Sequence, residues 1–191
     1  MPSESVNSID KVPISSGLAV IATCSPHNFD LVKSLGATAV FDYRSQSCAK
    51  DIRDFSKDSL SIVLDCITDA TTMKICYEAM GSCGGKYTGL DAFCMRIHTR
   101  NDITPHWIFV ATMFGEPLDM KGPYKRRARR QDVTFVTDWF VTVQDLLDNG
   151  LLKPHPIRVM PGGLGRVAEG IAELRLGKVS GEKLVYKICE R

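Results

Sequence analysis

The sequence predicts an α/β protein with a Rossmann-like, doubly wound parallel sheet. Three observations lead to this fold class. Short continuous apolar runs such as LAVIATC and SIVLDCI are typical of strands buried on both faces of a sheet. Segments with helical spacing separate these runs, and Gly or Pro marks many of the connections. Strands that alternate with helices at this spacing predict a parallel sheet.

The first part of the chain supplies four strands and three helices. Residues 1–17 are polar, with scattered apolar positions, so we expect a loose N-terminal tail. The apolar runs predict strands at residues 18–24, 38–43, 61–67 and 84–90. Helical spacing predicts helices at residues 29–35, 48–55 and 68–80. Gly36 suits the C-terminal cap of the first helix, and Ile52 and Phe55 are expected on the inward side of the second.

The second part of the chain continues the pattern. The run WIFVATMF, residues 107–114, is expected to form the fifth strand. A loop with Gly and Pro leads to a helix over residues 131–148, and one side of this helix carries Phe135, Trp139, Val143, Leu146 and Leu147. A strand beginning at Ile157, a helix over residues 167–176 and a strand over residues 183–188 complete the series.

A candidate ligand site follows the first of these strands, because ligands of open α/β sheets bind at the carboxyl ends of the strands. Ser25 suits a helix N-cap and Pro26 the first helical position, and a helix start favours anions. In dinucleotide-binding folds the end of the second strand faces the adenosine ribose, and an acidic residue there selects NAD by binding the ribose 2′-hydroxyl. The corresponding strand end of this sequence has no acidic residue. Ser25, His27 and Asn28 could instead donate hydrogen bonds to a 2′-phosphate, which indicates NADP(H). The alternative is a helix start that is simply well capped.

Composition narrows the functional classes. The 191 residues have a net charge of +2, which gives no reason to expect a nucleic-acid or membrane partner. No segment approaches the about 18 apolar residues of a membrane span, and no apolar leader is present, so we expect a cytoplasmic protein. The 7 cysteines stand singly without metal-ligand spacing, so we expect no metal site.

Four stretches carry a family resemblance: VIATCSPHNFDLVKSLGATAVFDYR, LDCIT, FGE and SGEKLV. With them the chain resembles the C-terminal half of fungal trans-acting enoyl reductases, which partner polyketide synthases and belong to the zinc-free branch of the medium-chain dehydrogenase/reductase superfamily. The resemblance implies reduction, with NADPH, of an enoyl group carried on an acyl carrier domain. Hydride adds to the β-carbon, and the α-carbon is then protonated.

The resemblance also implies roles for individual residues. Around the adenosine 2′-phosphate it places Ser25, Pro26, His27 and Asn28. It places Tyr43 by the adenine, with Arg44 as an additional phosphate partner, and Leu90 and Asp91 at the nicotinamide. Val179 and Ser180 would reach the cofactor from the last loop. The acyl substrate would be bordered by Ala111, Thr112, Met113, Phe114 and Gly115. No catalytic residue is assigned.

The strand order of the dinucleotide fold, 3-2-1-4-5-6, reveals what the chain lacks. The sequence supplies strands two to six, so we expect an incomplete fold in which the first strand and its glycine-rich turn are missing. Residues 18–191 would then form a truncated nucleotide-binding domain whose last helix and strand return toward an absent catalytic domain. Residues 5–15 could fill the slot, strands two and four could pair directly, or a partner could donate a strand. Pro13 disfavours the first option.

Two functional alternatives stay open at this point. NADPH binding could be weak or absent without the glycine-rich turn, and the chain would then be a non-catalytic remnant that binds the synthase or assists cyclisation. Exposed strand edges could also cause self-association. The run KRRARR, residues 125–130, has five basic residues in six. It is a solvated loop, a docking patch for an acidic carrier domain or a nuclear signal.

Overall fold

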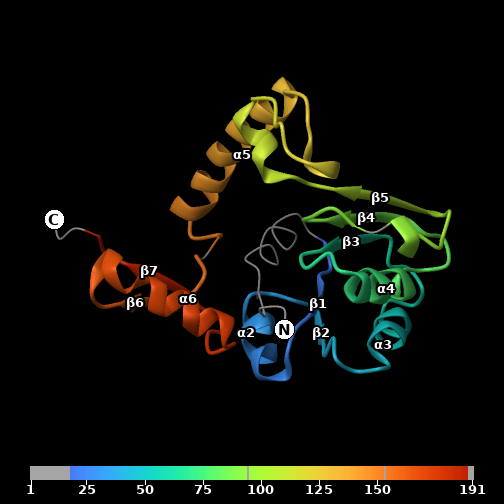
Figure 1. Ribbon diagram of the computed structural model, residues 1–191. Helices are drawn as coiled ribbons and strands as arrows, with labels where there is room; N and C mark the ends of the chain where they lie inside the picture. Colours follow the sequence, from blue (N-terminus) through green and yellow to red (C-terminus); the bar gives the residue numbers. More distant parts are fainter. Residues whose placement is uncertain (1–17, 94, 153, 189–191) are drawn as a thin grey trace. The chain divides into compact units, whose positions relative to one another are not determined.

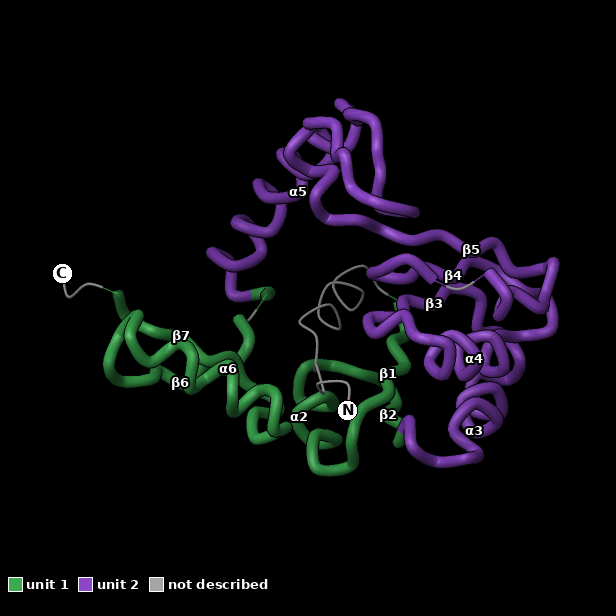
Figure 2. Tube along the Cα trace, in the orientation of Figure 1, with its two compact units in different colours: residues 1–42, 151–191 green, residues 43–150 purple. Residues whose placement is uncertain are grey.

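The computed structural model describes residues 18–93, 95–152 and 154–188. The expected tail, residues 1–17, lies outside the described residues. The chain divides into two compact units, which Figure 2 shows in green and purple. Unit 1 combines Met1–Asp42 with Leu151–Arg191, and unit 2 is Tyr43–Gly150. That residues 18–191 form one nucleotide-binding domain stays a prediction.

Unit 1 contains two parallel two-stranded sheets, β1-β2 and β6-β7. Its first elements are β1 (Ile21–Thr23), the 3₁₀ helix η2 (Pro26–Asn28), α2 (Phe29–Ser34) and β2 (Ala39–Phe41). The others are β6 (Ile157–Met160), η6 (Gly163–Arg166), α6 (Val167–Arg175) and β7 (Lys183–Tyr186). Gly36, with a φ of 102°, follows α2 as predicted, because only Gly adopts this conformation without a steric cost. The core beside β1 consists of Ala22, Cys24, Val32 and Ala37.

Unit 2 contains one parallel sheet of order β3-β4-β5, which Figure 1 shows beside α4. Its strands are β3 (Ile62–Asp65), β4 (Gly85–Gly89) and β5 (Ile103–Trp107). Its helices are α3 (Cys48–Phe55), α4 (Ala70–Ala79), η3 (Met95–Ile97), η4 (Val110–Phe114), η5 (Gly122–Tyr124) and α5 (Arg130–Asp148). The core lies between α4 and the sheet and consists of Met73, Tyr77, Met80, Tyr87 and Ile103.

The strand pairs agree with the predicted fold class. In the dinucleotide order, strand two pairs with strand three, and strands four, five and six lie side by side. The pairs β1-β2 and β3-β4-β5 follow this order, and all are parallel. Among the described strands, β1 pairs only with β2 and β3 pairs only with β4. Because β1 lies in unit 1 and β3 in unit 2, direct pairing of strands two and four stays an open option, and the option that uses residues 5–15 lies outside the described residues.

The prediction for the fifth strand was wrong. The strand is Ile103–Trp107 rather than residues 107–114, and its register places Pro105 opposite Tyr87. A proline inside a segment argues against a central strand, but β5 is the last strand of its sheet. An edge strand tolerates proline when the missing N–H faces away from the neighbouring strand. The apolar run that was predicted as strand instead turns into η4.

Two predicted inward faces are also different in the structure. The bounds of α3 are those predicted, and Ile52 is buried, but Phe55 is 50% exposed. The long helix α5 begins one residue earlier than predicted and has no buried residue among those described. On its surface Phe135 stacks on Trp139, with ring centroids 6.4 Å apart. Helical spacing identified the apolar side of α5 but could not tell what covers it.

Candidate functional site

Three polar side chains meet in unit 1, although more than 150 residues separate the outer members. The Nδ2 atom of Asn28 donates a hydrogen bond to Ser180 Oγ at 2.9 Å. The Nε2 atom of His27 lies 3.0 Å from the same oxygen. The structure therefore brings together His27 and Asn28, after the first strand, and Ser180, in the last loop. We call this group the His27–Asn28–Ser180 cluster.

Local backbone geometry places two members of the cluster. After β1 the chain stays extended at Ser25, whose φ is −67° and ψ 145°, and Pro26 opens η2 as predicted. The N–H of Asn28 donates to the carbonyl of Ser25 at 2.9 Å, which closes the turn. The side chain of Ser25 makes no capping hydrogen bond, so the expected N-cap interaction is absent at this described residue.

Burial separates the residues of this segment into two kinds. Ser25 is 1% exposed and Asn28 is 5% exposed, whereas Pro26 and His27 are exposed. In this arrangement a ligand reaches His27 and the half-buried Ser180, but not the Asn28 amide. Sequence spacing could not reveal this difference, because the partner of Asn28 comes from the other end of the chain.

Close packing brings the last loop to α2. Gly181 has a φ of 69°, and a Cβ atom added there would lie 3.0 Å from Leu31 Cδ2 and 3.1 Å from Asn28 Oδ1. Val179, two residues earlier, is 8% exposed. The glycine in SGEKLV therefore has a physical reason: it turns the chain and permits the approach of Ser180 to Asn28.

In unit 2 the loop after β4 carries the predicted nicotinamide contacts, Leu90 and Asp91. The N–H of Leu90 donates to Thr68 Oγ1 at 2.9 Å and to the carbonyl of Asp65 at 3.1 Å. The hydroxyl of Tyr124 donates to Asp91 Oδ1 at 2.7 Å. Both residues are exposed, so their side chains are accessible while neighbouring elements hold their positions.

Asp65 organises the end of β3, and the extent of its role was not predicted. Its Oδ1 accepts from the N–H groups of Ile67 and Thr68, and its Oδ2 accepts from the hydroxyls of Thr72 and Tyr87. The carboxylate is 4% exposed, so these four donors replace the water it loses. Burial, and then the charge of Asp65, raise the pKa of Tyr87, which keeps its hydroxyl protonated as a donor.

Neither Asp65 nor Thr68 is the N-cap of α4. Asp69 is the N-cap, and it exchanges hydrogen bonds with Thr72 in a capping box. Thr68 instead has a φ of 61°, an uncommon conformation for a β-branched residue. Its hydroxyl donates to the Asp65 carbonyl at 2.9 Å, which helps to hold that conformation.

The predicted substrate-facing residues lie in η4 and its cap rather than in a strand. Thr112 is held by its own hydroxyl, which donates to the Phe109 carbonyl at 3.0 Å, and Gly115 closes the turn with a φ of 75°. Ala111, Thr112 and Met113 are half-buried, but Phe114 is 71% exposed. Next to these residues, Ile108 and Val110 are 53% and 69% exposed, so this segment presents apolar side chains to solvent.

Aromatic rings anchor the loop that follows η4. Trp107, Phe109 and Tyr124 pack together with ring centroids 5.3–6.0 Å apart, and the guanidinium of Arg126 lies 4.2 Å from the centre of the Trp107 ring. Arg126 is thus a packing residue, although it belongs to the basic run KRRARR. A second cation–π pair involves the predicted adenine contact, because Arg44 lies 5.2 Å from the centre of the Tyr43 ring.

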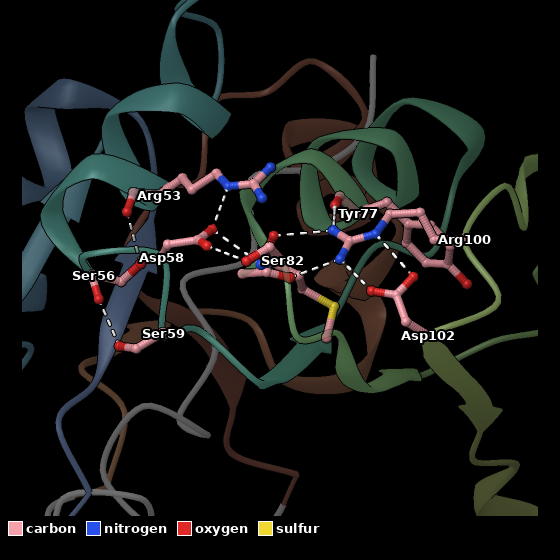
Figure 3. A network of polar contacts seen from close by, with 10 residues as sticks. Arg53, Ser56, Asp58, Ser59, Tyr77, Ser82, Arg100 and Asp102 are labelled. Atoms are coloured by element: carbon pink, nitrogen blue, oxygen red, sulfur yellow. Dashed lines mark hydrogen bonds and ion pairs between the residues drawn. The ribbon is translucent and has the colours of Figure 1, made fainter.

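A surface depression lies at the amino-terminal ends of the unit 2 strands, away from the loop that carries Leu90 and Asp91. The polar side chains around it form a network of hydrogen bonds and ion pairs (Figure 3). Arg100 donates to the carbonyls of Tyr77, Met80 and Gly81, at the end of α4 and just beyond it, and pairs with Asp102. Asp58 accepts from Arg53 and from Ser82. These groups bond to one another, and parallel sheets bind ligands at the other end, so we do not assign a site here.

No group of three or more His, Cys, Asp or Glu side chains in the described part of the chain is arranged to hold a metal ion. No helix described there is long and apolar enough to cross a membrane.

Comparison with known proteins identifies the relatives of this chain. No family model matches it. Trans-enoyl reductase apdC of Emericella nidulans is 50% identical over 174 residues, which cover 91% of this chain and 52% of that protein. Trans-enoyl reductase FSL5 of Gibberella zeae is 47% identical over 173 residues, which cover 91% of this chain and 48% of that protein. The chain is a relative of the fungal trans-enoyl reductases. The resemblance seen in the sequence motifs is confirmed.

The chain spans about half the length of the trans-enoyl reductases it matches. Solved structures support the fold. The CurF ER cyclopropanase from the curacin A biosynthetic pathway is 18% identical, with a TM-score of 0.67, over 92% of this chain and 50% of that one. The JamJ enoyl reductase is 16% identical, with the same TM-score of 0.67 and the same coverage. The predicted Rossmann-like α/β fold is confirmed.

Proposed function

We propose that the chain is the nucleotide-binding part of an NADPH-dependent enoyl reductase that acts on an enoyl group carried by the acyl carrier domain of a polyketide synthase. Its relatives are named trans-enoyl reductases and share up to 50% of aligned residues with it. The observation that carries the proposal is the contact of His27 and Asn28 with Ser180, because the family resemblance assigns all three residues to the cofactor.

At the adenosine end, the accessible donors to a 2′-phosphate are His27 and Ser180. Asn28 acts through Ser180, because its amide is buried and holds the serine oxygen. Ser25 and Pro26 supply the backbone that starts η2. Since no carboxylate stands in the segment from Cys24 to Asn28, a 2′-phosphate meets no repulsion from it.

At the nicotinamide end, the loop with Leu90 and Asp91 would contact the ring and its ribose. The exposed apolar segment around residues 111–115 would contact the acyl chain. NADPH would supply the hydride for the β-carbon of the enoyl group, and a proton then adds to the α-carbon. Leu90 is fixed through its N–H and Asp91 through Tyr124, so these residues orient the ring before any reaction occurs.

The partner and the compartment follow from the same proposal. Within KRRARR, Lys125 pairs with Asp119 and Arg129 with Asp132, and Arg126 packs on Trp107. Arg127 and Arg130 are exposed, and these two would meet an acidic carrier domain. We place the protein in the cytoplasm, in agreement with the composition.

Titration with NADPH, followed by nicotinamide fluorescence, tests the proposal. We expect weak but measurable binding, because the described residues include no glycine-rich turn to anchor the pyrophosphate. His27→Ala should weaken NADPH binding about tenfold or more, the usual loss for a hydrogen bond to a charged group. NADH, which lacks the 2′-phosphate, should bind more weakly than NADPH and should not respond to this variant.

Ser180→Ala should weaken NADPH binding by a smaller factor, and Ser34→Ala is its matched control. Ser34 is an exposed serine on α2 whose hydroxyl donates to the Leu31 carbonyl at 2.7 Å. Equal affinity for NADPH and NADH, or equal effects of both serine variants, would contradict the proposed phosphate site. No binding of either nucleotide would leave the non-catalytic alternative.

A further inference from the structure

The last loop, which joins α6 to β7 and carries Ser180, is held at both ends by main-chain hydrogen bonds within unit 1. At its start, the N–H of Lys178 donates to the Glu173 carbonyl at 3.0 Å, which is the 6→1 bond of a Schellman motif at the end of α6. At its end, the N–H of Lys183 donates to the Pro156 carbonyl at 2.8 Å. The loop therefore has two fixed ends, one on a helix and one beside β6.

One guanidinium connects these two ends. Arg158 lies in β6, and its Nη2 atom donates to Glu173 Oε2 at 3.0 Å. Its Nε atom lies 3.0 Å from Glu182 Oε1, and Glu182 is the residue immediately before β7. The side chain of Arg158 thus joins the residue that holds the start of the last loop to the residue that ends it.

The energetic effect of Arg158 is expected to be local. The side chains of Arg158, Glu173 and Glu182 are 31–38% exposed, so water screens the two ion pairs and their contribution to global stability is small. The Nε atom itself is buried and has no hydrogen-bond partner in the described structure. The Glu182 carboxylate is the group that offsets this buried donor, so the loop end is favoured beside Arg158.

Only Gly181 separates the anchored Glu182 from Ser180. Its φ of 69° is accessible to glycine at no steric cost, but glycine adopts many other conformations as readily, so the backbone alone does not fix Ser180. Val179, on the other side of Ser180, is buried. The position of the Ser180 hydroxyl, which accepts from Asn28 Nδ2 at 2.9 Å, then depends on the anchor at Glu182.

We propose that Arg158 is a positioning residue for the nucleotide site. Through Glu173 and Glu182 it clamps the two ends of the last loop, and it thereby holds Ser180 where a 2′-phosphate would bind. Arg158 is assigned no contact with the nucleotide. The inference rests on the proposed function, because that function makes Ser180 a donor to the phosphate. Arg158 should therefore affect the discrimination between NADPH and NADH, and not the binding of the parts that the two nucleotides share.

Arg158→Gln in the full chain of 191 residues tests the clamp, with affinities for NADPH and NADH measured by nicotinamide fluorescence. The variant should weaken NADPH binding about threefold or more, because one donor to the phosphate is displaced, and should leave NADH binding unchanged. Arg166→Gln is the matched control. It breaks the exposed ion pair between Arg166 and Glu169 in the same unit and should change neither affinity.

Two further variants show whether Arg158 acts through the last loop. Glu182→Gln breaks the same ion pair from the loop side and should also weaken NADPH binding without affecting NADH. In the Ser180→Ala background, Arg158→Gln should cause no additional loss of NADPH affinity, because the donor that it positions is already gone. An additional loss there would mean that Arg158 acts on the nucleotide by another route.

Amide hydrogen exchange without nucleotide gives a readout that does not depend on the proposed function. In Arg158→Gln the amides of Lys178 and Lys183, at the two ends of the loop, should exchange at least about tenfold faster. The amide of Leu35, which donates to the Leu31 carbonyl at the end of α2, should be unchanged and shows that the variant is folded. If the unchanged protein binds NADPH and NADH equally, the proposed phosphate site fails, while the exchange rates still decide whether the clamp exists.

Two other results would overturn the inference. One is an equal loss of NADPH and NADH affinity in Arg158→Gln, since a general destabilisation would then explain the variant. The other is unchanged exchange at Lys178 and Lys183, because the loop would then keep its position without Arg158.

Discussion

At the scale of single residues, sequence spacing could not predict which groups the buried polar side chains bond to. The carboxylate of Asp65 accepts four hydrogen bonds, two from the loop after β3, one from α4 and one from β4. Its position at a strand end could be read from the sequence. Its bond to Tyr87 could not, because strand register decides which side chain of β4 faces it.

Tyr87→Phe tests the strength of this network. The variant removes the donor at 2.9 Å from Asp65 Oδ2 and leaves Thr72 as the partner of that oxygen. We expect the free energy of unfolding to fall by about 1–3 kcal/mol, as for a hydrogen bond to a buried charge. Urea denaturation measures the change.

Tyr186→Phe is the matched control. The Tyr186 hydroxyl is buried and has no hydrogen-bond partner in the described structure, so its loss should leave stability unchanged or raise it. A larger loss for Tyr186→Phe than for Tyr87→Phe would show that the hydroxyl bonds are not the cause.

Asp58 gives a prediction on pH. Its hydrogen bonds from Ser82, first, and from Arg53 hold the pKa of its carboxyl below the ordinary value of 3.8. Since the pKa is lowered in the folded state, the ionised carboxylate adds stability above pH 3.8, and this contribution is lost as pH falls through the folded-state pKa. Asp58→Asn should therefore lower the Tm at pH 7, and the difference from the unchanged protein should shrink below pH 3.8. A difference that stays constant with pH would contradict this role.

At the scale of elements, helices and buried strands were predictable, and edges were not. The bounds of α3 agree with the prediction because its helical spacing needs no knowledge of neighbours. The strand β5 was missed because Pro105 and His106 make it read as a loop, and only an edge position explains them. The family resemblance assigned His27, Asn28 and Ser180 to the cofactor, but neither it nor a local pattern predicted the contact between the last loop and the start of α2.

Gly181→Ala tests how that loop is held. The variant should lower the free energy of unfolding by more than about 1 kcal/mol, because Ala disfavours a φ of 69° and its Cβ would press on Leu31 and Asn28. Thermal and urea unfolding measure the loss.

Gly177→Ala separates the two causes. Gly177 has a φ of 66° but nothing within 4 Å of the added Cβ, so it reports backbone strain alone. It should cost less stability than Gly181→Ala and leave NADPH affinity unchanged. Equal losses would mean that the approach of the loop to Asn28 contributes nothing.

At the scale of the whole molecule, the sequence predicted a Rossmann-like fold and a resemblance to the fungal trans-enoyl reductases, and the comparisons confirm both. The fold class could be predicted because the composition and the apolar runs indicate strands buried in a parallel sheet. The resemblance could be predicted because the four motifs are shared with related proteins. The division into two units was not predicted, since it depends on how segments such as residues 1–42 and 151–191 associate.

The central claim is that the His27–Asn28–Ser180 cluster binds the phosphate that distinguishes NADPH from NADH. Adenosine 2′,5′-bisphosphate carries this phosphate without the nicotinamide, so amide chemical shifts of the ¹⁵N-labelled chain during its titration test the claim most directly. We predict saturable shifts at the amides of Ser25, His27 and Asn28 and of residues 179–181, much smaller with adenosine 5′-monophosphate and lost in His27→Ala. Shifts confined to other segments, or equal shifts with both nucleotides, would contradict the claim.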